Sequence, residues 1–193
     1  MQEKNQIKIL EAALKEVPLH GWSDESLGKA CLNIGLDKYS YRLYFPEGIG
    51  QIVDLYFTQL DQQMVKQIKK LPLQNMKIRE RIKEAVLIRL KLLAPHKKLI
   101  SRTMSFLNMP WNYALGLKML WRTADLIWYE AGNDSSTDFN YYTKRSLLGG
   151  VYINTIMYFL NDSSLGYKDT IDFLERKLEN VISMGKFISK FYK

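Results

Sequence analysis

Apolar residues recur every three or four positions along most of the chain, which is the spacing of helices that each bury one face. No stretch alternates apolar and polar residues for long enough to predict a β-strand. The five prolines fall between the periodic segments, as they do where each marks a helix boundary. We therefore predict an all-α protein, with helices at about 2–17, 24–33, 37–44, 49–68, 76–93, 110–128, 139–160 and 168–184.

The segment 134–160 departs from this one-faced pattern. Its polar start ends at Asp138, whose carboxylate is a suitable N-cap for a helix. Beyond Tyr141 the helix is apolar on nearly every side, so it is either buried in protein or spans a bilayer. Its unbroken apolar part is shorter than the ~20 residues that a span requires, and it contains Asn154. We predict the buried central helix of a helical domain, with a polar and aromatic surface at its start.

The N-terminal segment has the spacing of a helix–turn–helix. Ser23 is a good N-cap for the second helix, and Asp37 is the predicted cap of a short third helix. With Leu43-Tyr44-Phe45 closing that third helix, the pattern resembles the TetR repressor family. We predict two domains: a degenerate helix–turn–helix head at 1–61, and a second helical domain at 62–193.

The charge of the head disfavours DNA binding. Residues 18–60 hold three Lys or Arg side chains against five Asp or Glu, although the whole chain carries a formal net charge of +8. Proteins that read DNA normally place basic side chains along the phosphates that they contact. We therefore predict no nucleic-acid partner, and a TetR-type, ligand-responsive transcriptional regulator remains the alternative function.

The basic excess of the chain lies in one segment, 62–104, which holds twelve Lys or Arg against two Asp or Glu. One interpretation is a solvated helix face. The other is attraction to an anionic membrane surface, to which each nearby basic side chain contributes about 1 kcal/mol. The C-terminal residues 185–193 also combine aromatic and basic side chains, as an interfacial anchor does. The sequence leaves both interpretations open.

Large, flexible apolar side chains are concentrated from residue 104 onward, and small residues alternate with tryptophans in the helix that follows Pro110. Such a stripe is ordinarily packed core. The excess of Trp, Met and Leu over what one buried face needs also fits a cavity for an adaptable apolar guest. On this second interpretation, the residues that hold a polyprenyl or phospholipid chain are Met104, Leu107, Trp111, Leu115, Met119, Trp121, Leu148 and Tyr152.

The sequence contains no recognisable catalytic or metal-binding motif. Its two histidines, His20 and His96, are far apart, and neither completes the Glu-x-x-His motif of a di-iron bundle. It has no Cys/His zinc spacing, phosphate loop or Gly-x-Ser-x-Gly turn. With a single cysteine, Cys31, the chain can form no intramolecular disulfide. We predict a protein that is not an enzyme and uses neither metal nor cofactor.

Several motifs point to one family: Gly21-Trp22-Ser23, Trp-Tyr-Glu-Ala-Gly at 128–132, Ser-Thr-Asp-Phe-Asn-Tyr-Tyr-Thr-Lys-Arg at 136–145, and Asn-Asp-Ser-Ser at 161–164. Over nearly its whole length the chain resembles the ubiquinone-biosynthesis accessory proteins called Coq nine. The resemblance implies a TetR-like fold that no longer binds DNA and that binds an isoprenoid lipid in its C-terminal domain. It further implies that the protein is a homodimer with a peripheral membrane location. It also implies a surface that binds the di-iron demethoxyubiquinone hydroxylase, formed here by Asp125, Ile127, Trp128, Asp138, Asn140, Tyr141, Tyr142 and Arg145.

Two features depart from the family pattern. Where the family usually has Trp-Tyr, this chain has Tyr141-Tyr142, so the largest aromatic anchor is missing. The family ends in a long amphipathic helix that docks on a membrane, whereas only about nine residues follow Met184 here. We therefore expect membrane attachment to be weaker or to involve the basic helix near 76–93.

The resemblance implies a location peripheral to the inner membrane, on the cytoplasmic side in a bacterium or on the matrix side in a mitochondrion. In that setting the protein would present quinone intermediates to the hydroxylase. An adaptor that acts by contact alone, with its apolar helices fully packed, is the third functional class that the sequence allows.

Overall fold

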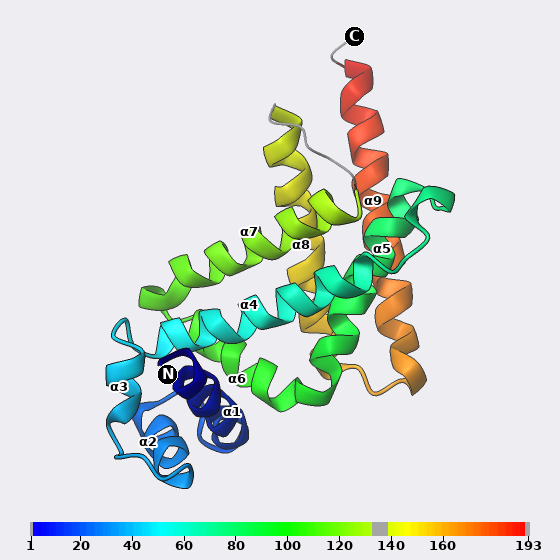
Figure 1. Ribbon diagram of the computed structural model, residues 1–193. Helices are drawn as coiled ribbons and strands as arrows, with labels where there is room; N and C mark the ends of the chain where they lie inside the picture. Colours follow the sequence, from blue (N-terminus) through cyan, green and yellow to red (C-terminus); the bar gives the residue numbers. More distant parts are fainter. Residues whose placement is uncertain (1, 133–138, 192–193) are drawn as a thin grey trace. The chain divides into compact units, whose positions relative to one another are not determined.

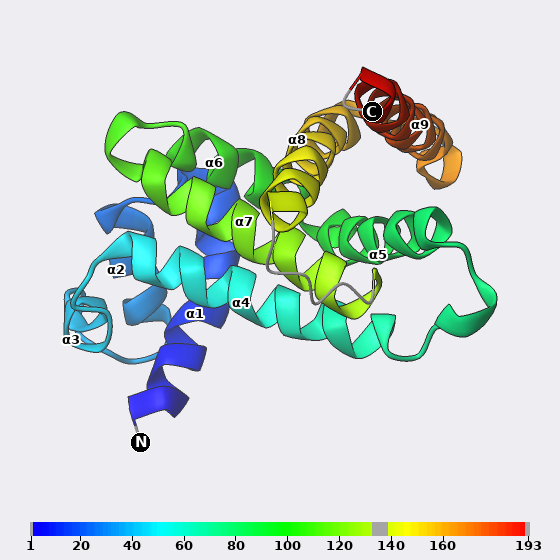
Figure 2. The same ribbon diagram turned by 90° about the horizontal axis from the view of Figure 1, so that it is seen from above.

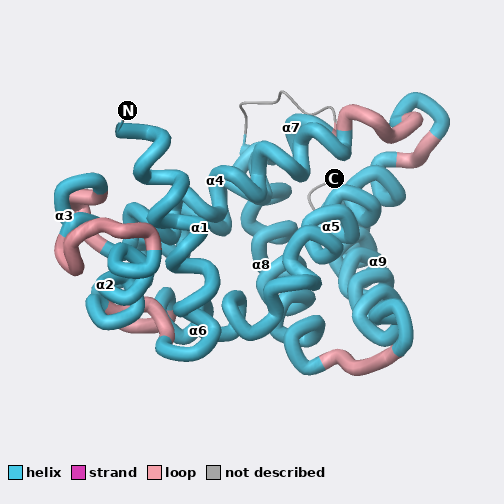
Figure 3. The backbone as a smooth tube through the Cα atoms, turned by 60° about the horizontal axis from the view of Figure 1, so that its bottom comes forward, coloured by secondary structure: helices cyan, strands magenta, loops and turns pink. Residues whose placement is uncertain are grey.

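The computed structural model describes the backbone of residues 2–132 and 139–191, and the side chains of 2–132 and 141–181. Within these ranges every regular element is a helix, as predicted (Figure 1 and Figure 3). The α-helices are α1 (Gln2–His20), α2 (Asp24–Asn33), α3 (Ser40–Tyr44), α4 (Ile49–Ile68), α5 (Ile78–Leu93), α6 (Lys97–Leu107), α7 (Tyr113–Glu130), α8 (Phe139–Asn161) and α9 (Lys168–Phe191). Short 3₁₀ helices are η1 (Leu73–Asn75), η2 (Ala94–His96), η3 (Pro110–Asn112) and η4 (Leu165–Tyr167).

Most predicted helix boundaries agree with the structure to within a few residues. The placement of all prolines between helices was wrong, because Pro18 lies in the last turns of α1. Its neighbour Val17 is fully buried, so packing against the core holds this end of the helix despite the missing amide proton. The last helix is also longer than predicted, since α9 continues to Phe191.

Local hydrogen bonds decide where the second and third helices start. Ser23 caps α2 as predicted: its hydroxyl accepts the Ser26 amide proton at 3.2 Å, and the Ser26 hydroxyl accepts the Ser23 amide proton at 3.1 Å. Asp37 does not cap α3. Its carboxylate accepts the Tyr39 amide proton at 2.9 Å, which forms a separate turn, and the helix begins only at Ser40.

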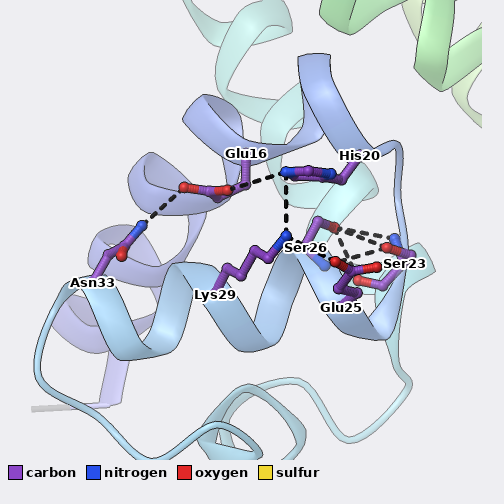
Figure 4. A network of polar contacts seen from close by, with 7 residues as sticks. All are labelled: Glu16, His20, Ser23, Glu25, Ser26, Lys29 and Asn33. Carbon is purple, nitrogen blue, oxygen red and sulfur yellow. Dashed lines mark hydrogen bonds and ion pairs between the residues drawn. The ribbon is translucent and has the colours of Figure 1, made fainter.

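Two of the three basic side chains within residues 18–60 form ion pairs with acidic neighbours. The ammonium group of Lys29 lies 2.7 Å from the Glu25 carboxylate and 3.3 Å from the His20 ring (Figure 4). The Arg42 guanidinium lies 3.0 Å from the Asp24 carboxylate. These ion pairs lower the positive potential that the head could offer to a polyanion.

The chain folds into two compact units. The first contains Met1–Leu60 and Pro95–Met119, and the second contains Asp61–Ala94 and Leu120–Lys193. We predicted a domain boundary after residue 61, and the first of the two segments of the first unit ends at Leu60, nearly the same point. It also includes α6 and the start of α7, which the sequence assigned to the second domain.

The first unit is built around α1, which packs against α2, α3 and α6. The indole N–H of Trp22 donates a buried hydrogen bond of 2.8 Å to the Thr103 hydroxyl, which ties the α1–α2 connection to α6. Gly21 at this connection has φ +71°, a conformation that favours glycine. The core side chains include Ile9, Leu10, Val17, Leu27, Cys31, Phe45, Ile52, Val53, Leu99 and Ile100.

In the second unit α5, α8 and α9 pack against one another, and α8 and α9 lie side by side (Figure 2). The prediction that α8 is buried on nearly every side was wrong. One stripe of it is exposed, because α5 and α9 cover only part of its surface. The exposed residues on α8 include Ser146, Gly150, Asn154, Met157 and Tyr158.

A buried ionic network joins four helices in the second unit. Asp61, near the end of α4, accepts hydrogen bonds from the Arg122 Nε at 2.8 Å and the Thr123 hydroxyl at 2.9 Å, both on α7. Its carboxylate also lies 3.0 Å from the guanidinium of Arg89 on α5, whose Nε donates to the Tyr152 hydroxyl on α8 at 3.2 Å. The network fixes the mutual positions of α5, α8 and the parts of α4 and α7 that belong to this unit.

Asp162 stabilises the connection between α8 and α9. One carboxylate oxygen accepts the Ser164 amide proton at 2.7 Å, and the other accepts the Thr170 amide and hydroxyl protons at 2.9 and 2.5 Å. Burial by itself would raise the pKa of Asp162, but these hydrogen bonds outweigh it and hold the pKa well below its usual range.

We expect this carboxylate to make stability depend on pH in the acidic range. The pKa of an aspartate in an unfolded chain is about 4, above the folded-state value, so the contribution of Asp162 is fully present above about pH 4. It is lost as the pH falls from there toward the folded-state pKa. Urea midpoints of wild type and Asp162→Asn, measured from about pH 6 to about pH 2, should converge as the pH falls. Parallel curves, or an equal effect of Asp169→Asn at an exposed site in the first turn of α9, would contradict this assignment.

Candidate functional site

An aromatic and charged cluster lies where α8 starts beside α7. The Arg145 guanidinium, 1% exposed, donates from Nε to the Asp125 carboxylate at 2.5 Å. It also stacks 3.4 Å from the centroid of the Tyr141 ring, and the Tyr141 hydroxyl donates to the same Asp125 oxygen at 3.0 Å. Desolvation by its surroundings, together with the bond to Asp125, raises the pKa of Tyr141, so its phenol stays protonated at neutral pH. The cluster therefore has a fixed geometry.

Three aromatic rings lie together beside this ion pair. The Trp121 ring centroid lies 6.2 Å from that of Tyr141 and 6.0 Å from that of Tyr142, and the two tyrosine rings are 5.1 Å apart, edge to face. Tyr142 is the outermost of the three and is 60% exposed. We call Trp121, Tyr141 and Tyr142 the aromatic surface.

Trp128 lies on α7 as well, seven residues beyond Trp121. Its indole N–H donates to the backbone carbonyl of Lys144 at 2.9 Å, and the Lys144 ammonium lies 5.7 Å from the indole ring centroid. This pairing links the end of α7 to the first turns of α8.

Trp128 and Lys144 also line an apolar pocket in the second unit. The pocket has a volume of about 280 Å³ and is enclosed by α5, α8, α9 and the end of α7. Its basic lining residue Arg79 lies 2.7 Å from Glu179 and is thereby neutralised. The lining residues are Ile78, Arg79, Ile82, Trp128, Lys144, Leu147, Leu148, Val151, Leu178 and Val181.

The structure corrects two of the predicted partner-binding residues. Arg145 is enclosed by Asp125 and Tyr141, and Ile127 is fully buried in the core, so neither side chain is exposed for direct contact with a partner. Tyr142 is exposed, and Trp128 is half-buried. Asp138 and the side chain of Asn140 lie outside the residues that the structure describes.

The predicted lipid-binding residues are divided between the two units. Met104, Leu107, Trp111, Leu115 and Met119 belong to the first, and Trp121, Leu148 and Tyr152 to the second. Of these, Leu148 lines the pocket described above. Trp111 is 77% exposed, and the Tyr152 hydroxyl belongs to the buried network with Arg89.

Most of the pocket residues were missed by the sequence analysis. Ile78, Ile82, Leu178 and Val181 recur at helical spacing and were interpreted as ordinary core faces. The apolar stripes on α5 and α9 gave no local sign that they leave a gap where they meet α8. A pocket between helices depends on how the helices pack together, and the apolar periodicity of each single helix does not specify that packing.

The basic segment 62–104 presents less positive charge than its composition suggests. Arg89 is fully buried, and Lys83 and Lys69 pair with Glu175 and Glu130 at 2.9 and 3.5 Å. The segment is also divided between the two units. Fewer of its basic side chains than its composition suggests are therefore available to an anionic surface.

Two further observations concern the residues with described positions. They include no group of three or more His, Cys, Asp or Glu side chains arranged to hold a metal ion. Among the helices as far as they are described, none is both long and apolar enough to cross a membrane.

The chain is similar to known proteins in both sequence and fold. The family model described as COQ9, the Coq nine family of the sequence analysis, matches residues 113–185. Over 95% of its length the chain is similar to the mitochondrial ubiquinone biosynthesis protein COQ9 of Homo sapiens, at 33% identity, and of Bos taurus, at 31%. The chain spans 59% of the length of each of these relatives.

A solved structure shares the fold. The TetR transcriptional regulator from Nitrosomonas europaea ATCC 19718 matches with a TM-score of 0.71, over 93% of this chain and 98% of that chain, at 20% identity. At this identity the match shows the fold alone. The resemblance predicted from the sequence motifs is confirmed: over its described residues the chain has a TetR-like, all-helical fold, and residues 113–185 match the COQ9 family model.

Proposed function

We propose that this protein is a non-enzymatic accessory protein of ubiquinone biosynthesis, which binds an isoprenoid quinone intermediate and presents it to the di-iron demethoxyubiquinone hydroxylase. The observation that carries the proposal is that the pocket-lining residues Trp128 and Lys144 lie on the same two helices as the aromatic surface: Trp128 follows Trp121 by seven residues on α7, and Lys144 follows Tyr142 by two residues on α8. A lipid held in the pocket would thus lie next to the surface that contacts the partner.

The pocket suits part of an isoprenoid chain. Its volume of about 280 Å³ is near the lower end of the ~300–1,000 Å³ typical of small-molecule sites, and its lining is almost entirely apolar. Apolar walls favour a guest without hydrogen-bonding groups, since a polar group would lose its water there without compensation. The chain of a quinone intermediate meets this requirement, while its polar ring would remain at the Lys144 end.

The alternative function, a ligand-responsive DNA-binding regulator, gains no support from the fold match. The cations Lys29 and Arg42 of the head are paired with carboxylates, and the net charge of residues 18–60 is negative. Phosphate contacts supply most of the affinity of a non-specific DNA complex, so such a head should bind DNA poorly.

The remaining parts of the proposal concern assembly and location. We infer a homodimer, and we infer a peripheral association with the inner membrane, where the hydrophobic substrates of the pathway reside. The relatives named above are mitochondrial proteins. In a bacterium the equivalent location is the cytoplasmic side of the inner membrane.

Filling the pocket tests the proposal. Val181 is half-buried and lines the pocket, so Val181→Trp should occupy much of its volume and exclude a guest. Purified wild type, extracted with organic solvent and measured by mass spectrometry, should yield an isoprenoid lipid, and the variant should yield at least several-fold less. The matched control is Val65→Trp, at an equally half-buried position of α4 that does not line the pocket. An equal lipid content in all three proteins would contradict this assignment of the pocket.

A further inference from the structure

The connection between α6 and α7 in the first unit exposes large apolar side chains at close intervals. Trp111 is 77% exposed, Tyr113 58%, Leu117 49% and Met109 42%. Tyr113 and Leu117 are four residues apart on α7, so their side chains share one face of that helix. We call these four residues the Trp111 corner. Exposed apolar groups of this size, gathered within nine residues, commonly mark a site of interaction.

The Trp111 corner has a defined backbone. The Asn112 amide group donates from Nδ2 to the Phe106 carbonyl at 2.9 Å, and the Asn112 backbone N–H donates to the Met109 carbonyl at the same distance. The start of α7 also passes close to the end of α6, since a Cβ placed on Gly116 would lie 3.5 Å from the Leu107 Cβ. Trp111 is therefore held outward on an ordered 3₁₀ turn.

Basic side chains adjoin this corner along α6. Lys98, Arg102 and Ser105 are exposed and fall at spacings of four and three, which places them on one line of the helix. α6 ends at Leu107, two residues before Met109, so the end of this helix leads into the corner. Lys98 and Arg102 also line an open depression of about 330 Å³ with Ser101 and Pro18, which has room for a phosphate group.

All charged residues in the segment around this corner are basic. Residues 95–119 contain four Lys or Arg and no Asp or Glu. Lys118 is paired with Asp54 of α4 at 3.0 Å, so the basic character lies chiefly on α6. An apolar rim of Trp, Tyr and Met beside a basic face is the arrangement that favours the interface of an anionic bilayer.

We propose that the Trp111 corner inserts into the interfacial layer of an anionic phospholipid membrane, with Lys98 and Arg102 contacting lipid phosphates. The inference rests on the proposed function only in that the protein works at a membrane. It assigns the contact to α6, η3 and the start of α7, a different place from the basic segment as a whole and from the C-terminal helix. Insertion removes Trp111, Tyr113, Met109 and Leu117 from water while the basic face stays at the level of the headgroups.

The first experiment measures binding of the full chain to vesicles in the absence of any partner protein. Vesicles of phosphatidylcholine mixed with phosphatidylglycerol are compared with vesicles of phosphatidylcholine alone. Trp111→Ser should lower the partition coefficient into the mixed vesicles by at least about tenfold, which corresponds to about 1.4 kcal/mol. The matched control is Leu43→Ser, which removes an apolar side chain that is 75% exposed in the acidic head of the same unit and should leave binding unchanged.

A second pair of measurements locates the inserted side chain. Trp111→Phe keeps an aromatic ring and should retain most of the binding, but it removes the most exposed tryptophan. Lipids brominated along the acyl chain should therefore quench the fluorescence of wild type more strongly than that of Trp111→Phe. Lys98→Gln combined with Arg102→Gln should abolish the preference for phosphatidylglycerol, and raising the salt from 0.1 M, where the Debye length is ~10 Å, toward 1 M should weaken wild-type binding.

The inference is overturned if Trp111→Ser and Leu43→Ser bind the mixed vesicles as wild type does, or if wild type does not bind them. It is also overturned if Trp111→Ser changes only the sedimentation of the protein alone or its affinity for the hydroxylase in detergent-free solution, because the corner then contacts protein. None of these outcomes affects the lipid content of the pocket in the second unit, so the proposed function is tested separately.

Discussion

Replacing Asp61 with alanine is expected to lower the free energy of unfolding by about 3–5 kcal/mol, the usual cost of removing one partner from a buried ion pair. The Asp61 side chain is 3% exposed, and its carboxylate contacts both Arg89 and Arg122. In the variant the fully buried Arg89 guanidinium loses the carboxylate that balances its charge. At about 2–4 °C per kcal/mol for a chain of this size, the melting temperature should fall by roughly 6–20 °C.

A second aspartate on α4 serves as a control that distinguishes the loss of a buried ion pair from the loss of an exposed one. Asp54 lies seven residues before Asp61 on α4 and pairs with Lys118, whose side chain is 66% exposed. Asp54→Ala should cost less than about 1 kcal/mol, because water screens such a pair. Asp61→Asn, which keeps the shape of the side chain, should still be markedly destabilising. Calorimetry that finds Asp61→Ala and Asp54→Ala equally stable would show that the buried network contributes little.

The helical character of the chain and the positions of most helices could be predicted from the sequence because apolar periodicity is a local property, although α6 was not among the predicted helices. The positions of α2 and α4 agree with the predicted ones, and the Ser23 cap follows from the preference of a serine hydroxyl for a free amide proton. The exposed stripe of α8 could not be predicted in this way. An apolar side chain such as Met157 is buried only if another helix reaches it, and α5 and α9 cover other faces.

The burial of Arg89 and Arg145 was missed for a related reason. Each arginine lies in a segment whose composition is basic and polar, so both were counted as surface charges. Each is buried because a carboxylate from another helix reaches it: Asp61 for Arg89, and Asp125 for Arg145. Sequence periodicity reports which face of a helix is apolar, whereas the pairing of two distant charges depends on tertiary packing.

Parts of the candidate site were accessible from the sequence and parts were not. The aromatic surface was anticipated, because Tyr141 and Tyr142 are adjacent and point about 100° apart on a helix, so both cannot face the core. The structure places Tyr142 outside, as that argument requires. The pocket was predicted at other residues, because the excess of tryptophan in α7 suggested a cavity wall, whereas the aliphatic faces of α5 and α9 have the pattern of ordinary core. Trp111 shows the error most clearly, because it is the most exposed tryptophan rather than a cavity wall.

Replacing Tyr142 with alanine is expected to weaken association with the hydroxylase about thirtyfold, from a loss of about 2 kcal/mol at 1.4 kcal/mol per tenfold. The phenol ring is 60% exposed and lies against Trp121 and Tyr141, so it is a rigid aromatic group that a partner can cover at small entropic cost. Arg145 is not a comparable probe. Its guanidinium is buried against Asp125 and the Tyr141 ring, so its removal would disturb the aromatic surface itself.

The decisive comparison is with a tyrosine of similar exposure in the first unit. Tyr39 is 54% exposed, and Tyr39→Ala should leave the affinity for the hydroxylase unchanged. Because Tyr142 already contacts water over most of its surface, Tyr142→Ala should melt within a few degrees of wild type. If instead the variant unfolds early while its folded fraction binds the hydroxylase normally, as measured by calorimetry and titration, then Tyr142 stabilises the start of α8 and the partner binds elsewhere.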